Sequence, residues 1–445
     1  MAKVLIAGRA LGALNGEIRI PGDKSMSHRA VMLAALAEGD THIEGFLSGE
    51  DNLSTAAIFA QMGVAIDWHN AAKSALTVHG VGLHGLREPV GVLDAGNAGT
   101  CARLMVGVLA GQPFHSVLVG DASLHQRPMA RVTDPARLMG AHIDGRDGGS
   151  KLPLAIRGGA LHGMDFEPKV ASAQVKSCVL LAGLFADGAT RVREPRPTRD
   201  HTERMLPLFG QPVVSEAGWI VLRPTDLLTA PQATVVIPSD PSSAAFFAVA
   251  AALVPGSSLR LPAVGMNPRR DGWRRIFTAM GGVVTMVNSA EVGSEPVADL
   301  EVMASRLHGV TVAATDVPDA IDEFPLLFAA AVLAEGEFLL HGAAELRVKE
   351  SDRIAVMADA LNAAGAQVEA LEDGARIVGT GHLAGGCTVD AHGDHRIAMA
   401  MAVAAQCADA PITIRNAEAI ATSFPDFVPL AQQLGMNLQW SEAAG

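Results

Sequence analysis

The chain has 445 residues, which exceeds the size at which one hydrophobic core usually stops growing, so we expect two domains. Hydrophobic residues make up 49% of it and aromatic residues 4%, and the formal net charge is −13. This composition disfavours single-stranded nucleic-acid binding, which needs aromatic stacking, and non-specific binding to anionic polymers or lipids. An anionic ligand would therefore need a locally basic pocket.

Targeting and redox signals point to one compartment. The longest apolar runs, such as Ala244–Val254, are much shorter than the roughly 18 residues of a membrane span, and the N-terminal residues show no signal or transit pattern. Cys101, Cys178, Cys387 and Cys407 are scattered, with no CxxC pair. We expect free thiols in a cytoplasmic protein that contacts neither membrane nor nucleic acid.

One pattern recurs six times along the chain: a short polar turn, a helix-length run of Ala, Leu and Val, and a break that usually contains Gly. The turns are Pro21–His28, Ala95–Thr100, Val170–Ser177, Pro238–Ser243, Ala320–Pro325 and His392–Arg396. Their marker residues are Asp23, Asn97, Ser172, Asp240, Asp322 and Asp394, separated by 74, 75, 68, 82 and 72 residues. This spacing predicts six α/β units, three in each domain, with a boundary near Ser239 and Asp240.

Each marker is a predicted helix N-cap, because Asp, Asn and Ser accept hydrogen bonds from free backbone amides. The runs that follow are apolar on most faces, so we expect buried helices. Polar residues at helix starts usually act only as caps, but these turns also carry Lys, Arg and Gln. Helix starts together with such cations favour a site for several anionic groups. The residues concerned are Lys24, Ser25, Arg29, Gly99, Arg103, Gln174, Lys176, Asp322, Glu323, His395 and Arg396.

Two further segments add cations: one contains Arg127 and Arg131, and the other is Glu345–Arg353. If the second segment is helical, Lys349 and Arg353 share a face. If Ser351 is instead an N-cap, Lys349 and Glu350 lie on the preceding loop. The sequence leaves both arrangements open.

Taken together, the segments resemble the 5-enolpyruvylshikimate-3-phosphate synthase family. PGDKSMSHR, GNAGT, GDASLHQRPM, SAQVKS, TRDHTE, RVKESDR, GDHRIAM and ATSFPDF occur in the family's order. SAQVKS, TRDHTE and ATSFPDF resemble the branch that includes glyphosate-tolerant bacterial enzymes. The resemblance implies an α/β fold of two similar domains, each built from three βαβαββ units as an inside-out α/β barrel. Residues 1–21 would join 240–445 in one domain, and residues 22–239 would form the other.

The resemblance also implies an activity. The enolpyruvyl group of phosphoenolpyruvate would pass to the 5-hydroxyl of shikimate 3-phosphate by addition and elimination, with release of phosphate, in chorismate and aromatic amino-acid biosynthesis. Lys24, Asp322 and Glu350 would be catalytic, at the phosphate, the hydroxyl and C3 respectively. We expect a monomer that needs no cofactor and no metal.

The implied ligand sets follow from the family's motifs. The shikimate 3-phosphate contacts would be Lys24, Ser25, Arg29, Ser172, Ala173, Gln174, Arg199, Asp322 and Lys349. The phosphoenolpyruvate contacts would be Lys24, Gly99, Arg127, Gln174, Glu350, Arg353 and Arg396. Thr422 stands where many relatives have Lys, so no ligand is assigned there. Gly99 keeps the small residue that the inhibitor glyphosate needs, and we hypothesise sensitivity to it at this position.

Three alternatives stay open. Enolpyruvyl transfer to UDP-N-acetylglucosamine would use the same architecture, but those enzymes usually carry a reactive Cys in a loop, and Asp121–Arg131 has none. A non-catalytic anion-binding relative would not need both Asp322 and Glu350. His392, Asp394 and His395 contain metal-ligand types and could form a metal site.

Overall fold

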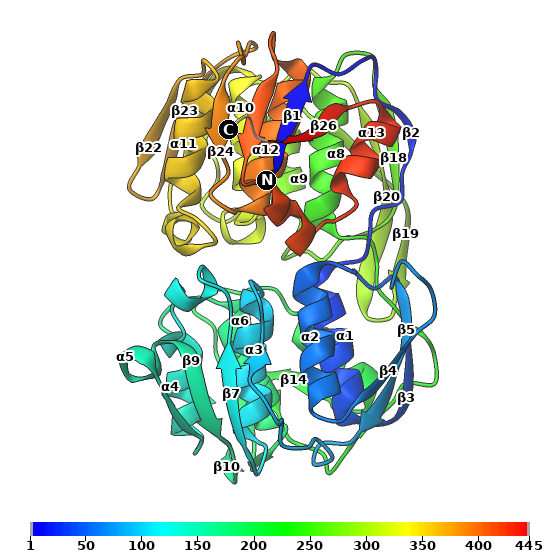
Figure 1. Cartoon of the computed structure of the whole chain (residues 1–445), viewed down its shortest axis with the longest axis vertical. Helices are drawn as coiled ribbons and strands as arrows, with labels where there is room; N and C mark the ends of the chain where they lie inside the picture. The colour runs from blue at the N-terminus through cyan, green and yellow to red at the C-terminus, as the bar shows by residue number, and fades with distance from the viewer. Residues whose placement is uncertain (1–2, 443–445) are drawn as a thin grey trace. The chain divides into compact units, whose positions relative to one another are not determined.

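The computed structural model describes residues 3–442, and the chain divides into two compact units (Figure 1). The first unit comprises Met1–Pro21, Pro238–Glu291 and Pro296–Gly445, and the second comprises Gly22–Ile237 and Val292–Glu295. Each unit has its own hydrophobic core. None of the helices in the described residues is long and apolar enough to cross a membrane.

Each unit contains three sheets that share one strand order. An edge strand runs parallel to its neighbour, that neighbour runs antiparallel to a third strand, and a fourth strand forms the other edge. In four of the sheets the chain order is strand, helix, strand, helix, strand, strand, and the strand that comes last lies between the two that precede it. The other two sheets have the same arrangement but borrow one strand from elsewhere in the chain, residues 228–236 in one and residues 3–8 in the other. This is the βαβαββ arrangement implied by the family resemblance.

The second unit also contains a separate two-stranded sheet, in which β10 (Leu161–His162) pairs with β12 (Ala186–Asp187). The first sheet consists of β16 (Leu228–Thr229) and β17 (Val235–Val236), β3 (Ala37–Glu44), β5 (Ala75–Val81) and β4 (Ala65–Trp68), with α1 (Lys24–Leu36) and α2 (Glu50–Gln61). The next consists of β6 (Leu93–Asp94), β7 (His115–Val119), β9 (Lys151–Arg157) and β8 (His142–Gly145), with α3 (Gly99–Ala110) and α4 (Ala130–Leu138). The third consists of β11 (Asp165–Phe166), β13 (Thr190–Val192), β15 (Trp219–Leu222) and β14 (Val213–Glu216), with α6 (Ala173–Gly183) and α7 (His201–Met205).

The first unit repeats the arrangement. Its sheets are β2 (Asn15–Glu17), β18 (Ser258–Gly265), β20 (Glu295–Met303) and β19 (Val283–Val292), with α8 (Pro241–Leu253) and α9 (Gly272–Ala279). Next come β21 (Glu335–Leu340), β23 (Gly374–Thr380) and β22 (Val368–Leu371), with α10 (Phe324–Val332) and α11 (Arg353–Ala363). The last are β24 (Thr388–Asp390), β25 (Ile412–Arg415), β1 (Lys3–Gly8) and β26 (Asn437–Glu442), with α12 (His395–Ala404) and α13 (Phe427–Leu434). In the middle sheet, isolated parallel bridges from His308 and Thr311 to β21 take the place of the first strand.

The N-terminal strands explain why residues up to Pro21 belong with the C-terminal half. Strand β1 pairs with β25 and β26, and β2 pairs in parallel with β18. The Ser239 hydroxyl donates to the Ile20 carbonyl (2.8 Å), and the Asp240 amide donates to the Pro21 carbonyl (2.9 Å). The units therefore divide at Ile237 and Pro238, two residues before the predicted boundary, and the segment Val292–Glu295 was not anticipated in the second unit.

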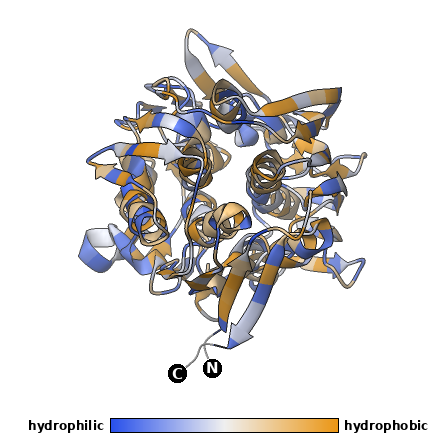
Figure 2. Ribbon diagram, turned by 90° about the horizontal axis from the view of Figure 1, so that it is seen from above, coloured by the Kyte–Doolittle hydropathy of each residue, from blue (hydrophilic) through white to orange (hydrophobic). Residues whose placement is uncertain are grey.

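The six helices that follow the polar turns (α1, α3, α6, α8, α10 and α12) are buried, as their composition predicts. Every residue of α10 is buried, and in α8 only Leu253 is not. Ribbons coloured by hydropathy show helices that are largely apolar and strands whose colours alternate along their length (Figure 2). Alternation is expected for strands with one face on a core and the other in solvent.

Four of the six predicted N-caps are present. Asp23, Ser172, Asp240 and Asp394 each accept a hydrogen bond from a first-turn amide of the helix that follows. The other two predictions were wrong. Helix α3 begins after Ala98 and α10 begins after Glu323, and no side chain caps either of them. Asn97 and Asp322 instead use their side chains in tertiary contacts described below.

We predict that Gly107→Ala destabilises the second unit. A Cβ at Gly107 would lie 2.3 Å from the Cys178 carbonyl oxygen, where α3 packs on α6, so the backbone of one helix must move. Overpacking of this kind costs about 1–3 kcal/mol. Thermal unfolding should show a lower Tm for this variant than for Gly91→Ala, whose Cβ meets nothing within 4 Å. Equal Tm values for the two variants would contradict the close approach.

Candidate active site

In the first unit, the cations and acids at the predicted turns gather around one buried side chain. The Arg353 guanidinium is almost fully buried and donates to Asp394 (Nε to Oδ2, 2.8 Å), Glu350 (Nη2 to Oε2, 2.6 Å) and Asp322 (Nη1 to Oδ1, 3.3 Å). Burial alone would lower the pKa of Arg353, but the three carboxylates raise it above its ordinary value. The Lys349 ammonium lies 3.3 Å from the same oxygen of Asp322.

The local backbone explains this convergence. Helix α11 starts at Arg353, and its N-cap is Asp352, which accepts from the Ala355 amide (3.0 Å). Lys349 and Glu350 therefore lie on the segment before the helix, as one of the two open arrangements proposed, although the cap is Asp352 and not Ser351. Glu350 can then fold back onto Arg353.

Asp394 joins α12 to this cluster. Its carboxylate accepts from the Arg396 amide (2.9 Å) as the cap of α12, and it also accepts from Arg353 and from the Ser351 hydroxyl (3.1 Å). The Arg396 side chain donates from Nη1 to the Asp322 carbonyl (3.0 Å) and to Glu323 Oε1 (3.4 Å). Within residues 3–442, no group of three His, Cys, Asp or Glu side chains could hold a metal ion, so His392, Asp394 and His395 form no such group.

In the second unit, a polar cluster forms around Gly99, at the start of α3. Arg103 donates to the side-chain carbonyl of Gln174 (2.8 Å), and Gln174 donates to the Thr100 hydroxyl (3.1 Å). Arg127 donates to the side-chain carbonyl of Asn97 (2.9 Å), and the Asn97 amide donates to Asp121 (2.6 Å). A Cβ at Gly99 would lie 2.9 Å from Nη1 of both Arg103 and Arg127, so only glycine leaves room for both guanidinium groups.

A second cluster lies along α1. Lys24, the first residue of the helix, forms an ion pair with Asp51. Arg29 is buried and donates to the Thr202 hydroxyl (2.7 Å), the Ser177 hydroxyl (2.8 Å) and the Ser25 carbonyl (2.9 Å). All three acceptors are uncharged, and burial lowers the pKa of Arg29 to about 10. Among residues 3–442, no carboxylate forms a hydrogen bond or ion pair with this buried guanidinium.

Comparisons with known proteins bear on what these clusters do. The family described as EPSP synthase (3-phosphoshikimate 1-carboxyvinyltransferase) matches residues 9–430. The chain belongs to the EPSP synthase family. Among its relatives are the 3-phosphoshikimate 1-carboxyvinyltransferases of Alkalilimnicola ehrlichii, 54% identical over 98% of this chain and 96% of that protein, and of Halorhodospira halophila, 55% identical over 96% and 95%.

Solved structures agree with the fold. The EPSP synthase from Acinetobacter baumannii is 47% identical, with a TM-score of 0.88 over 99% of this chain and 100% of that one. The enolpyruvyl transferase NikO from Streptomyces tendae is 17% identical, with a TM-score of 0.79 over both whole chains, and this likeness concerns the fold alone. The family and the α/β fold expected from the sequence motifs are confirmed.

Within the EPSP synthase family fold, one cation expected near a site is used structurally. Lys176, which the sequence grouped with the reactive residues, is buried and pairs with Glu194 (2.8 Å) and Glu203 (2.7 Å). Its ammonium also donates to the carbonyl of Thr198 (3.4 Å), and Thr198 directly precedes Arg199. Burial raises the pKa of Glu203, although Lys176 opposes this shift. Lys176 therefore fixes the segment that carries Arg199. Arg103, which the resemblance did not include among the ligands, contacts Gln174 directly.

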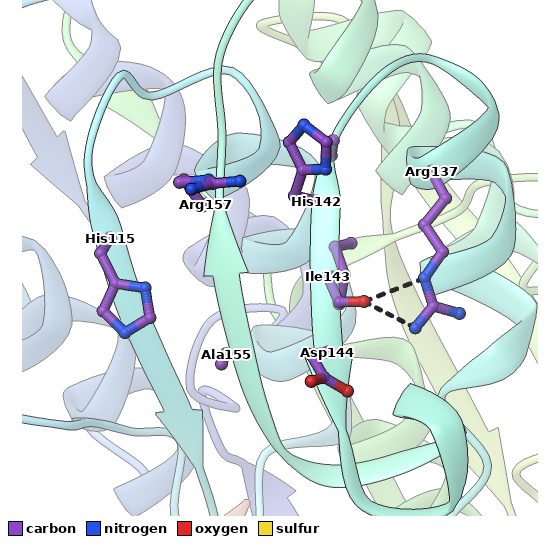
Figure 3. A pocket seen from close by; sticks show the side chains of 8 residues that line it. His115, Arg137, His142, Ile143, Asp144, Ala155 and Arg157 are labelled. Atoms are coloured by element: carbon purple, nitrogen blue, oxygen red, sulfur yellow. Dashed lines mark hydrogen bonds between the residues drawn. The ribbon is translucent and has the colours of Figure 1, made fainter.

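A hollow of about 460 Å³ in the second unit lies apart from these clusters (Figure 3). His115, Arg157 and His142 stand side by side across β7, β9 and β8, and Arg137 donates two hydrogen bonds to the Ile143 carbonyl. The hollow is lined by none of the residues expected to bind substrate. Its His and Arg side chains are exposed or half-exposed, which is typical of a solvated sheet surface.

Proposed function

We propose that the protein catalyses the 3-phosphoshikimate 1-carboxyvinyltransferase reaction. The observation that carries this proposal is the pairing of Asp322 and Glu350 on one buried guanidinium, in a chain 54% identical to enzymes of that name. The transfer needs a proton acceptor and a proton donor, and Asp322 and Glu350 are two acids held close to one another for these tasks. The two substrates bring roughly six negative charges, since each phosphate carries about −1.5 to −2 and each of the two carboxylates about −1. The abundance of Arg and Lys in the clusters suits them.

Each acid has a proposed task in the two-step transfer. In the addition, the 5-hydroxyl oxygen of shikimate 3-phosphate bonds to C2 of phosphoenolpyruvate while the C2–C3 double bond becomes a single bond. Asp322 takes the hydroxyl proton, and Glu350, as general acid, gives a proton to C3. In the elimination, Glu350 takes a proton back from C3, the C2–C3 double bond forms again, the bond from C2 to the phosphate oxygen breaks, and Lys24 supplies a proton to the leaving phosphate. The step needs general acids and bases only, each within hydrogen-bond reach of its atom.

The remaining residues have proposed binding roles. Arg29, with a buried charge that lacks a carboxylate partner, suits an anionic acceptor substrate, together with Lys24, Ser25, Ser172, Ala173, Gln174, Arg199, Asp322 and Lys349. Gly99, Arg127, Gln174, Glu350, Arg353 and Arg396 would take phosphoenolpyruvate, again with Lys24. Planar guanidinium groups bind carboxylate and phosphate with two parallel hydrogen bonds. Action as a monomer in the cytoplasm stays a prediction; the four free cysteines fit a reducing compartment.

The first experiment measures phosphate release with both substrates and with each omitted in turn. We expect release only when both are present, and we expect Asp322→Asn and Glu350→Gln to lower kcat by about 10²- to 10⁴-fold, the usual contribution of a positioned acid or base. Glu369→Gln, an exposed acid on β22, serves as the control. Folded wild-type protein that binds both substrates and releases no phosphate would contradict the proposal.

Gly99→Ala tests the site around α3. Because the new Cβ must displace the Arg103 and Arg127 guanidinium groups, we expect a higher KM for phosphoenolpyruvate and weaker inhibition by glyphosate. The KM for shikimate 3-phosphate should change little. Inhibition curves for wild type and variant that coincide would rule out a role of Gly99 in inhibitor sensitivity.

The lowered pKa of Arg29 predicts that the binding of shikimate 3-phosphate depends on pH. An anionic ligand favours the charged guanidinium, so affinity should be complete below the pKa of about 10 and should fall as pH rises through it. In Arg29→Lys the fall should occur at lower pH, because a buried ammonium loses its proton more readily. Titrations followed by intrinsic fluorescence, with circular dichroism to verify folding at each pH, test this. Identical profiles for the two proteins would assign the fall to another group.

A further inference from the structure

Glu323 follows the proposed catalytic acid Asp322 and is buried, with 1% of its surface exposed. It is the N-cap residue of α10, yet its side chain does not cap the helix. Instead Oε1 accepts from the Ser242 hydroxyl and from Arg396 Nη1 (3.4 Å). Oε2 is buried and has no hydrogen-bond partner in the described residues. Burying this carboxylate without using it to cap the adjacent helix costs free energy of folding. The tertiary contacts of Glu323 must therefore contribute something that offsets the cost.

Glu323 is the fourth of five residues in a largely buried chain of contacts whose charged members alternate in sign. Arg270 Nη2 donates to the Ser242 hydroxyl (2.7 Å) and lies 3.3 Å from Asp240 Oδ1. Asp240 in turn caps α8 through the Ser242 amide (2.7 Å). The order is therefore Asp240, Arg270, Ser242, Glu323 and Arg396, and all members except Arg396 are buried. These contacts hold Glu323 Oε1 in one place.

Glu323, the member of this chain of contacts that touches Arg396, restrains the orientation of the Arg396 guanidinium. Both of its hydrogen bonds within residues 3–442, to the Asp322 carbonyl and to Glu323, come from Nη1. Nε and Nη2 make none there and remain available. Two adjacent N–H groups on a planar cation match the two oxygens of a carboxylate or phosphate.

We propose that Glu323 is a positioning residue that fixes Arg396 for binding of phosphoenolpyruvate, an inference that rests on the function proposed above. Glu323 touches no reacting atom; it neutralises part of the Arg396 charge and restrains Nη1, so that Nε and Nη2 keep a constant direction. Without it, Arg396 would have only the Asp322 carbonyl to orient it.

Steady-state kinetics on Glu323→Ala and Glu323→Gln test the proposal. Glu323→Ala should raise the KM for phosphoenolpyruvate about tenfold or more, because hydrogen bonds to charged groups are among the stronger ones, and should leave the KM for shikimate 3-phosphate nearly unchanged. Glu323→Gln keeps an acceptor at Oε1 and should recover most of the loss. Asp359→Asn, an exposed acid on α11, is the control. Equal changes in both KM values, or no recovery by Gln, would overturn the proposal.

A readout independent of turnover separates this proposal from the proposed function. The ¹⁵Nε signal of Arg396, assigned by its loss in Arg396→Lys, should report an ordered side chain in wild type and a mobile one in Glu323→Ala. If wild type shows no phosphate release, the proposed function fails, and this signal still decides the positioning role. An Arg396 signal that stays ordered in Glu323→Ala would overturn it. Should Glu323→Ala not fold, Ser242→Ala removes the other contact to Oε1 and should produce a smaller change in the same direction.

Discussion

Burial of the Arg353 guanidinium is the constraint on which the first unit's cluster depends. A cation out of water is stable there only because Asp394, Glu350 and Asp322 surround it. Removing one partner from such an arrangement typically costs about 3–5 kcal/mol, since the other charges stay buried. Asp394 also caps α12, so the same interaction joins the starts of α11 and α12 to the turn at Asp322. The two acids are thus oriented before any ligand arrives.

Arg29 is also a buried guanidinium, but its hydrogen-bond partners differ from those of Arg353. Its hydrogen bonds go to two hydroxyls and a carbonyl, and burial lowers its pKa to about 10, although Glu203 and Asp23, which make no hydrogen bond to it, act in the opposite direction. A ligand carboxylate or phosphate would supply the missing negative charge. The cost of burying Arg353 is offset within the protein by three carboxylates, whereas Arg29 has only neutral hydrogen-bond acceptors among residues 3–442.

The sequence predicts those features that depend on neighbours along the chain. Asp23, Ser172, Asp240 and Asp394 cap their helices because a cap needs only the next three residues. Asn97 and Asp322 looked equivalent but are drawn away by Arg127 and by Arg353, from distant segments. The sequence placed Lys176 among the residues of a possible anion site, but in the structure its ammonium pairs with Glu194 and Glu203. The family motifs name the residues proposed for the site, whereas the tertiary partners of each side chain, which spacing along the sequence does not reveal, come only from the structure.

The two uncapped helix starts connect the repeat to the chemistry. A capping side chain satisfies only one or two of the four free amides at a helix start, and a start without a cap leaves more of them open. At α3 the cap is absent, Gly99 removes the side chain that would cover the first turn, and Arg103 and Arg127 lie beside it. At α10, Pro325 lacks an amide hydrogen, so fewer donors need a partner and Asp322 is released to face Lys349 and Arg353. In both copies the first turn that no side chain caps lies close to cations from the same unit: Arg103 and Arg127 at α3, and Lys349 and Arg353 at the turn before α10.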